Sequence, residues 1–168
     1  LELSEENNIF KINNLNLDNN LRIIRFDKAF FDFKDNDKQI NFFTINRKDN
    51  LYFLKGTKLN ANKLIEDITN IGTDNKFEVF KEDFKLNIDL KEVRLDELHK
   101  VKNLRGKLNF RNNDLIDGNL NALFNDGKKF SFTVKTNFNE QITTLFLDKA
   151  EPIIKRYKFV KGFNEGSL

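Results

Sequence analysis

Apolar and polar residues alternate with few faults between Leu104 and Phe138. The apolar side chains fall on even positions, and the set comprises Leu108, Phe110, Leu120, Ala122, Phe124, Phe130, Phe132, Val134 and Phe138. Because successive side chains of a strand point to opposite faces, this spacing predicts strands with one apolar and one polar face. The segment 125–128 reads Asn-Asp-Gly-Lys, and Asp-Gly supplies the positive φ values of a tight hairpin turn. The stretch therefore predicts an antiparallel hairpin.

The rest of the chain shows strand patterns at intervals of roughly 8 to 12 residues, which is typical of an all-β meander. Short apolar runs broken by Asn and Asp predict two or three strands in 9–26. The runs 26–33 and 40–45 flank a second turn-rich segment at 34–38, and 51–54 predicts a strand that ends at the following glycine. A further strand is predicted where apolar residues alternate without a fault, at Phe84, Leu86, Ile88 and Leu90.

Two segments instead show the i, i+3, i+4 apolar spacing of a helix. One covers about 60–71, where Asn60 is suited to cap the helix start. The other covers about 148–157, where Asp148 begins a capping-box pattern. A weaker helical pattern covers 95–101.

These patterns together predict a mainly β protein, a curved and twisted antiparallel sheet with two or three short helices. Strands followed by a helix occur twice, so the element order indicates a weak internal repeat with segments 1–76 and 77–168. The chain contains no Met, so we expect it to be a fragment of a larger protein.

Charge and composition narrow the range of partners. The 29 Lys and Arg and the 26 Asp and Glu residues are interspersed, with a net charge of +3, as on an ordinary solvated surface. Sheet platforms that stack bases carry aromatic and basic side chains on one face, whereas Phe130 and Phe132 alternate with Ser131 and are out of phase with Lys135. We therefore expect no nucleic-acid partner. The sequence has no cysteine, so no disulfide is expected.

Residues that carry catalysis are scarce. His99 is the only histidine, and a zinc site would need three or four ligands. A solvated loop histidine is therefore the simpler interpretation. The carboxylate pairs at 82–83 and 96–97 flank predicted strands and are interpreted as solubilising charges. The sequence contains no phosphate-binding glycine loop or nucleophile elbow. We expect no enzyme activity, no catalytic residue, no metal and no cofactor.

The apolar face of the predicted sheet leaves two hypotheses open. If a helix or a second sheet covers it, each buried Leu, Ile or Phe contributes ~1.5–3 kcal/mol and the core is closed. The two predicted helices are short for such a face. An incompletely covered face could instead hold acyl chains.

Several motifs resemble those of the AsmA-like family of Gram-negative envelopes, especially the C-terminal-type region of YhdP- and TamB-type bridge-like lipid transport proteins. In that family a strand ends in an Asp-x-Ala helix, and a loop then leads to a Gly-Gly-x-Leu strand. The segments 145–155 and 162–168 resemble this element, with Glu165 in place of the first glycine. A Leu-x-Gly-x-Leu strand at 104–108 and a Gly-x-Leu-x-Ala strand at 118–122 also resemble the family.

The resemblance covers 77–168 and is faint for 1–76. It implies a half-pipe, or β-groove, in a protein anchored in the inner membrane and extending through the periplasm. That groove would carry phospholipid between the inner and outer membranes, with acyl chains as its ligand and envelope proteins as further partners. The helix at 148–157 would cap the groove locally. The lipid-groove residues that the resemblance implies are Phe84, Leu86, Ile88, Leu90, Leu108, Phe110, Leu120, Ala122, Phe124, Phe130, Phe132, Val134 and Phe146.

Two points stay open at this stage. Strand 142–147 has apolar residues on both parities, so its sequence does not fix which face is apolar. The alternative function is that of a structural or adhesive β-repeat module with a closed core and no ligand.

Overall fold

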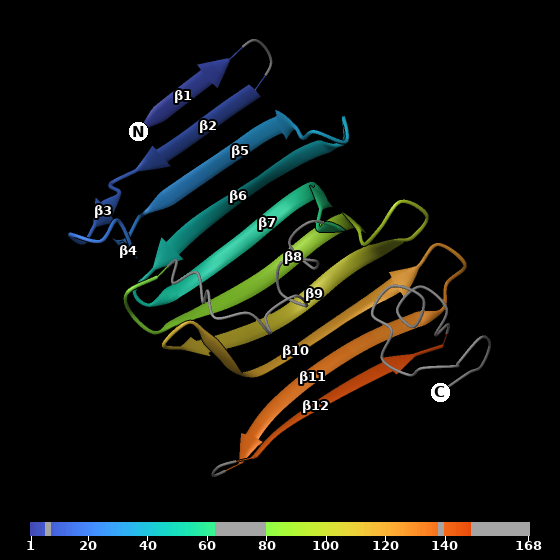
Figure 1. Ribbon diagram of the computed structural model, residues 1–168. Coiled ribbons are helices and arrows are strands. Elements are labelled where there is room, and N and C mark those ends of the chain that lie inside the picture. The colour runs from blue at the N-terminus through green and yellow to red at the C-terminus, as the bar shows by residue number, and fades with distance from the viewer. Residues whose placement is uncertain (6–7, 63–79, 138–139, 149–168) are drawn as a thin grey trace.

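The computed structural model describes residues 1–5, 8–62, 80–137 and 140–148. Within these ranges the protein is mainly β, as the sequence predicts, and ten strands form one open sheet (Figure 1). The strands of this sheet are β1 (Glu2–Glu5), β2 (Asn8–Asn13), β5 (Lys28–Lys34), β6 (Ile40–Lys48), β7 (Leu51–Asn60), β8 (Phe84–Arg94), β9 (Lys100–Arg111), β10 (Asp114–Phe124), β11 (Lys129–Asn137) and β12 (Glu140–Leu147). A separate pair, β3 (Asn16–Leu17) and β4 (Ile23–Arg25), interrupts the path from β2 to β5.

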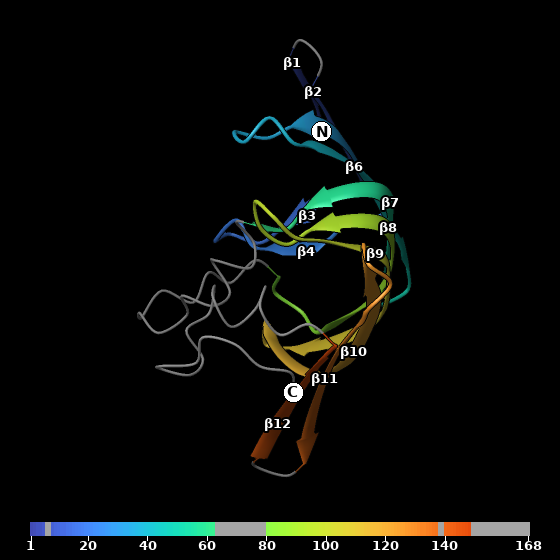
Figure 2. The same ribbon diagram turned by 90° about the vertical axis from the view of Figure 1, so that its right-hand side faces the viewer.

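Neighbouring strands of the sheet are antiparallel at every pairing but one. The strand β7 pairs with β8 in parallel, with Leu51 opposite Lys85 and Gly56 opposite Leu90. Because the two strands are parallel, the end of β7 at Asn60 and the start of β8 at Phe84 lie at opposite ends of this pair. The segments 1–76 and 77–168 thus contribute their described strands to one continuous sheet. Figure 2 shows that this sheet twists and curves along its length.

The predicted turns are found where the sequence places them. Gly127 has a φ of 81°, and the backbone N–H of Phe124 donates to the carbonyl of Lys128 at 2.8 Å. The 34–38 turn joins β5 to β6. A further tight turn, Asn112-Asn113, joins β9 to β10 with φ values of 50° and 63°. Asn tolerates this left-handed region better than most residues, which explains its use at both positions.

The helix predictions have different outcomes. The weak pattern at 95–101 is wrong, because residues 95–99 form the loop of the β8–β9 hairpin and β9 begins at Lys100. Most of the helices predicted at 60–71 and 148–157 lies outside the described residues. The Oδ1 atom of Asn60 accepts a hydrogen bond from the backbone N–H of Asn62 at 3.2 Å, the contact that the capping prediction requires. No helix within the described ranges is long and apolar enough to cross a membrane.

The strand predicted to end at Gly56 continues to Asn60, because Gly56 serves close strand packing and does not end the strand. A Cβ atom at this position would lie 2.5 Å from the carbonyl oxygen of Phe42 and 2.5 Å from the Cβ of Phe43 on β6. The absent side chain lets the two strands approach at a register shift of the β6–β7 ladder.

Two apolar clusters form the core. The larger one contains Leu54, Ala61, Leu90, Val93, Val101, Ala122 and Phe124, and the smaller one contains Phe26, Ala29 and Tyr52. The larger cluster contains buried residues of both segments, 1–76 and 77–168. The buried residues of the smaller cluster all belong to 1–76, and partly buried residues of 77–168 pack against them. We call the sheet face that carries these clusters the inner face and the opposite one the outer face.

The inner-face parity reverses near one end of β7, β8 and β9. Along β8 the buried positions are even up to Leu90 and odd from Val93, although both side chains belong to the larger cluster. The β8–β9 ladder is interrupted between these positions, since the pairing passes from Leu90 opposite Leu104 to Glu92 opposite Lys102. Asn103, in the skipped pair, has a φ of 55°. We call this interruption of β8 and β9 the bend. The even-numbered positions predicted to be apolar therefore lie on the inner face only on the side of the bend that contains Leu90 and Leu104.

Candidate functional site: the apolar inner face

Strand register places the predicted groove residues relative to one another. Side chains of directly opposed residues lie on the same face of a sheet. Phe84 is opposite Phe110, and Leu86 is opposite Leu108. Leu120 is opposite Phe132, Ala122 is opposite Phe130, and Gly118 joins Leu108 to Val134. Leu90, Phe124 and the partly buried Ile88 belong to the larger cluster. All predicted groove residues except Phe146 therefore share the inner face.

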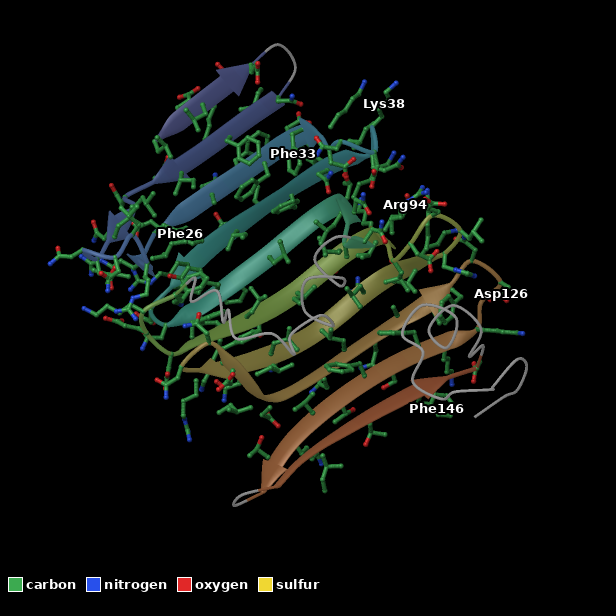
Figure 3. All side chains as sticks on the ribbon, in the orientation of Figure 1. Phe26, Phe33, Lys38, Arg94, Asp126 and Phe146 are labelled. Atoms are coloured by element: carbon green, nitrogen blue, oxygen red, sulfur yellow. The ribbon has the colours of Figure 1, made fainter. Side chains whose placement is uncertain are left out.

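Phe146 lies on the outer face, which corrects its inclusion in the groove. Its Cα is opposite Ser131, which lies between Phe130 and Phe132 and points away from them. The ring is 48% exposed. Figure 3 shows Phe146 on the edge strand β12. Ile142 is opposite Lys135 in the same register and is 53% exposed, so it shares the outer face with Phe146.

Along β8 to β11 the outer face is mainly polar and charged, whereas Phe30 and Phe42 contact each other on the outer face of β5 and β6. Residues on its odd-numbered positions along β8 and β9 include Asp89 and Arg105, whose side chains form an ion pair at 3.0 Å. Exposed lysines occupy the same face, at Lys85 on β8 and Lys107 on β9. The sheet thus has the contrast between faces that the alternation predicts.

An aromatic cluster closes one end of the inner face. The segment 14–27, which carries β3 and β4, packs Leu15 and Ile23 against the smaller core cluster. The ring of Phe80 lies 4.2 Å from the ring of Phe84 and 5.7 Å from that of Tyr52, measured between centroids. Figure 2 shows β3 and β4 on the inner side of the sheet. Phe84 and Leu86 are therefore core residues of the protein.

The larger cluster closes another part of the inner face. Leu90 is 1% exposed and Val101 is 0% exposed, and Ala122 and Phe124 are also buried. Phe130 and Ile88 pack against this cluster. Side chains buried to this degree have no surface left for a ligand.

Five predicted groove residues remain outside both clusters. One of them, Val134, is only 2% exposed. We call the other four the β9–β11 patch: Leu108, Phe110, Leu120 and Phe132. All four side chains are half-buried. Leu120 on β10 is opposite Gly106 on β9 and Phe132 on β11, whereas Leu108 on β9 is opposite Gly118 on β10. Leu108 and Leu120 therefore lie in adjacent rows of the sheet. The glycines allow close packing here, since a Cβ atom at Gly118 would lie 2.7 Å from the Cδ2 atom of Leu108.

Two cavities formed by the described residues have no patch residue in their linings. One of about 20 Å³ is lined by Tyr52, Phe80 and neighbouring polar residues. Another, of about 150 Å³, is lined mainly by polar and charged side chains at one end of the strands. The patch is therefore a surface between neighbouring strands, and neither of these cavities encloses it.

His99 has a structural role in the β8–β9 loop. Its Nδ1 atom lies 2.9 Å from each carboxylate oxygen of Asp96, which also accepts the backbone N–H groups of Leu98 and His99. Burial raises the pKa of Asp96, but these hydrogen bonds outweigh it and hold the pKa below its usual value. The histidine is half-buried and paired, not the solvated side chain that the sequence suggested. Among the described residues no group of His, Asp and Glu could hold a metal ion.

The carboxylate of Asp83 also has a structural partner. Its Oδ1 atom accepts a hydrogen bond from the backbone N–H of Asn112 at 3.0 Å, which supports the β9–β10 turn. The sequence pattern did not indicate this contact, because the two residues are far apart in the chain.

Comparison with known proteins adds no assignment. No protein-family model matches the chain, and no curated protein or solved structure is significantly similar to it.

Proposed function

We propose that the β9–β11 patch binds acyl chains and that the protein is a segment of a half-pipe that carries phospholipid, in the manner of the AsmA-like family. The observation that carries the proposal is the group of four half-buried apolar side chains on the inner face of strands whose outer face is mainly polar and charged. In this proposal the protein acts without catalysis, in the periplasm, as part of an inner-membrane-anchored chain.

The physical basis is removal of hydrocarbon from water. Burial of apolar surface contributes about 25 cal/mol per Å² and has no directional requirement. A group of Leu and Phe side chains can therefore hold acyl chains of different length and let these acyl chains move over the sheet. The aromatic cluster around Phe80 would end this surface at the β3–β4 side.

The test replaces Phe132 by Asp. A carboxylate in the middle of the patch disfavours a hydrocarbon neighbour, because an unpaired charge cannot be desolvated cheaply. We expect Phe132→Asp to abolish copurification of phospholipid, measured by native mass spectrometry with lipid extraction, while the protein keeps its β-sheet circular dichroism. The matched control is Ser131→Asp, because Ser131 is the next residue on β11 and lies on the outer face. Retention of wild-type lipid by Phe132→Asp would contradict the proposal.

A second candidate function is a structural or adhesive module with a closed core. The observation in its favour is the near-complete burial of Leu90, Val93 and Val101. In that case Phe132→Asp should lower the free energy of unfolding by several kcal/mol, and the wild-type protein should contain no lipid.

A further inference from the structure

We propose that the cavity at the β6–β7–β8 end of the outer face binds a phosphate-type oxyanion. The residues that line it are Lys38, Gln39, Ile40, Lys58, Leu59, Asn60, Glu92, Arg94 and Lys100. It has a volume of about 150 Å³, and four of its side chains are cationic whereas one is a carboxylate. The site is independent of the acyl-chain proposal, because it lies away from the β9–β11 patch.

One turn and three strand ends bring these cations together. Lys38 comes from the β5–β6 turn and Lys58 from β7, while Arg94 ends β8 and Lys100 begins β9. Figure 3 shows Lys38 and Arg94 at the same end of the strands. The parity reversal in β7 and β8 contributes directly, because beyond it the even-numbered Lys58, Glu92 and Arg94 share the face opposite Val93.

The positive charge of the cavity is only partly balanced. Lys100 forms an ion pair with Glu92 at 3.0 Å. Arg94 donates from its two terminal nitrogens to the side-chain oxygen of Gln39 and the carbonyl of Glu97, both uncharged acceptors, and keeps further N–H donors. Lys38 and Lys58 have no ion-pair partner within the described ranges.

The cavity wall is held by a buried amide and carboxylate network. Asn41 is 2% exposed, and its Oδ1 atom accepts the backbone N–H of Asn60 at 2.8 Å. The Oδ2 atom of Asp35 accepts from the side chains of Asn60 at 2.7 Å and Asn41 at 3.2 Å. The Asp35 carboxylate thus accepts hydrogen bonds from side-chain amide groups in the wall of the cavity. These contacts fix the β5–β6 turn, in which the backbone N–H of Lys38 donates to the carbonyl of Asp35.

A phosphate group fits this combination of features. Its oxygens accept several hydrogen bonds at once, and bonds from Arg and Lys to such an anion are stronger than neutral ones. Two lysines without carboxylate partners, with a guanidinium held in place by its hydrogen bonds, favour an oxyanion with several acceptor oxygens over chloride. The same chemistry is presented by free phosphate and by an anionic lipid headgroup.

The first experiment titrates the protein with inorganic phosphate by isothermal titration calorimetry at low ionic strength. We expect Lys38→Gln/Lys58→Gln to weaken phosphate binding at least ~10-fold, because two charge-assisted hydrogen bonds are removed. Glu92→Gln should strengthen binding, since it releases Lys100. The matched control is Lys85→Gln/Lys107→Gln, which removes the same charge from exposed outer-face positions outside the cavity. Equal weakening in both double variants would overturn the proposal.

A second arm separates the two sources of the oxyanion. Cosedimentation is measured with vesicles of phosphatidylcholine alone and with vesicles that also contain phosphatidylglycerol. Binding to the anionic vesicles that is lost in Lys38→Gln/Lys58→Gln and kept in the control assigns the site to a lipid headgroup. Binding of inorganic phosphate alone assigns it to a soluble phosphate compound. Failure to bind either probe would overturn the proposal while leaving the Phe132→Asp test unaffected.

Discussion

At the scale of single residues, Gly106 is fixed by the backbone of the neighbouring strand. A Cβ atom at this position would overlap the carbonyl oxygen of Asn119 on β10. A backbone atom in a sheet cannot move aside as a flexible side chain can. The glycine is therefore required by strand packing, and the Leu-x-Gly-x-Leu pattern at 104–108 has a structural cause.

We predict that Gly106→Ala lowers the free energy of unfolding by about 1–3 kcal/mol, as measured by urea denaturation. The control is Gly127→Asn. Gly127 has a φ of 81° and nothing within 4 Å of its Cβ position, and Asn tolerates this conformation. The control should cost clearly less, and equal costs would show that close packing is not the reason for Gly106.

Asp35 gives a prediction for the pH dependence of stability. Burial raises the pKa of Asp35, but hydrogen bonds from Asn60, Gln39 and Asn41 outweigh this effect and hold its pKa below the usual value. A lowered pKa in the folded state means that the carboxylate stabilises the protein above the unfolded-state pKa of about 3.9. This contribution is lost as the pH falls through the lower folded-state pKa.

Asp35→Asn should therefore be less stable than the wild type near neutral pH, and should lose less stability than the wild type on acidification. Urea denaturation at a series of pH values between neutral and acidic measures this. The control is Asp37→Asn in the same turn, which changes one exposed carboxylate outside the amide network. If the free energies of unfolding of the wild type and of Asp35→Asn fell in parallel across the acid range, the Asp35 carboxylate would not be the source of this pH dependence.

Residue-level properties could be predicted from the sequence where they depend on neighbours along the chain. The even parity of Leu120, Ala122 and Phe132 and the Asp-Gly turn are of this kind. Phe146 was placed on the wrong face because its strand has apolar residues on both parities, and only pairing with Ser131 defines its side. The amide network around Asp35 joins residues as many as 25 positions apart, so no local signal indicates it.

At the scale of elements, the bend in β9 depends on Asn103. This residue has a φ of 55° at the skipped pair where the inner-face parity reverses. A β-branched residue in this region of φ is strongly disfavoured. We predict that Asn103→Val costs about 1–2 kcal/mol of stability and that Asn103→Gly costs less than this.

The control for this prediction is Asn119→Val, an exposed strand position of ordinary pairing opposite Lys107. Valine is favoured at such positions, so this variant should be neutral or slightly stabilising in thermal denaturation. If Asn103→Val were as stable as Asn119→Val, the bend would not depend on the left-handed backbone. The sequence predicts each of these strands but not the bend, because the pattern on each side of Asn103 looks like an ordinary alternation.

At the scale of the whole molecule, both core clusters bridge the parallel pairing of β7 and β8. Leu54 and Ala61 share one cluster with Leu90, Val101 and Phe124. The two sequence segments, 1–76 and 77–168, therefore cannot each bury their apolar residues alone. We predict that the described sheet unfolds as one cooperative unit.

The variant that tests this is Leu90→Ala, which should cost about 2–5 kcal/mol because it leaves a cavity at a buried site. Amide hydrogen exchange should lose protection in β5 and β6 as well as in β9 and β10. Leu98→Ala, at an exposed loop position, is the control and should change neither quantity. Loss of protection confined to residues after Phe80 would show two independent units.

The parallel pairing of β7 and β8 also determines the order in which the sheet can assemble. Apart from β2 and β5, which residues 14–27 connect, consecutive strands on either side are joined by short connections, so each antiparallel set closes over a small sequence distance and at low entropic cost. The pairing of Leu54 with Ile88 instead joins two strands that residues 61–83 separate along the chain. During synthesis β7 therefore emerges with an unpaired edge, since its partner β8 is made only after these residues. We expect this edge to be the place where a chaperone or a second chain has the longest opportunity to bind.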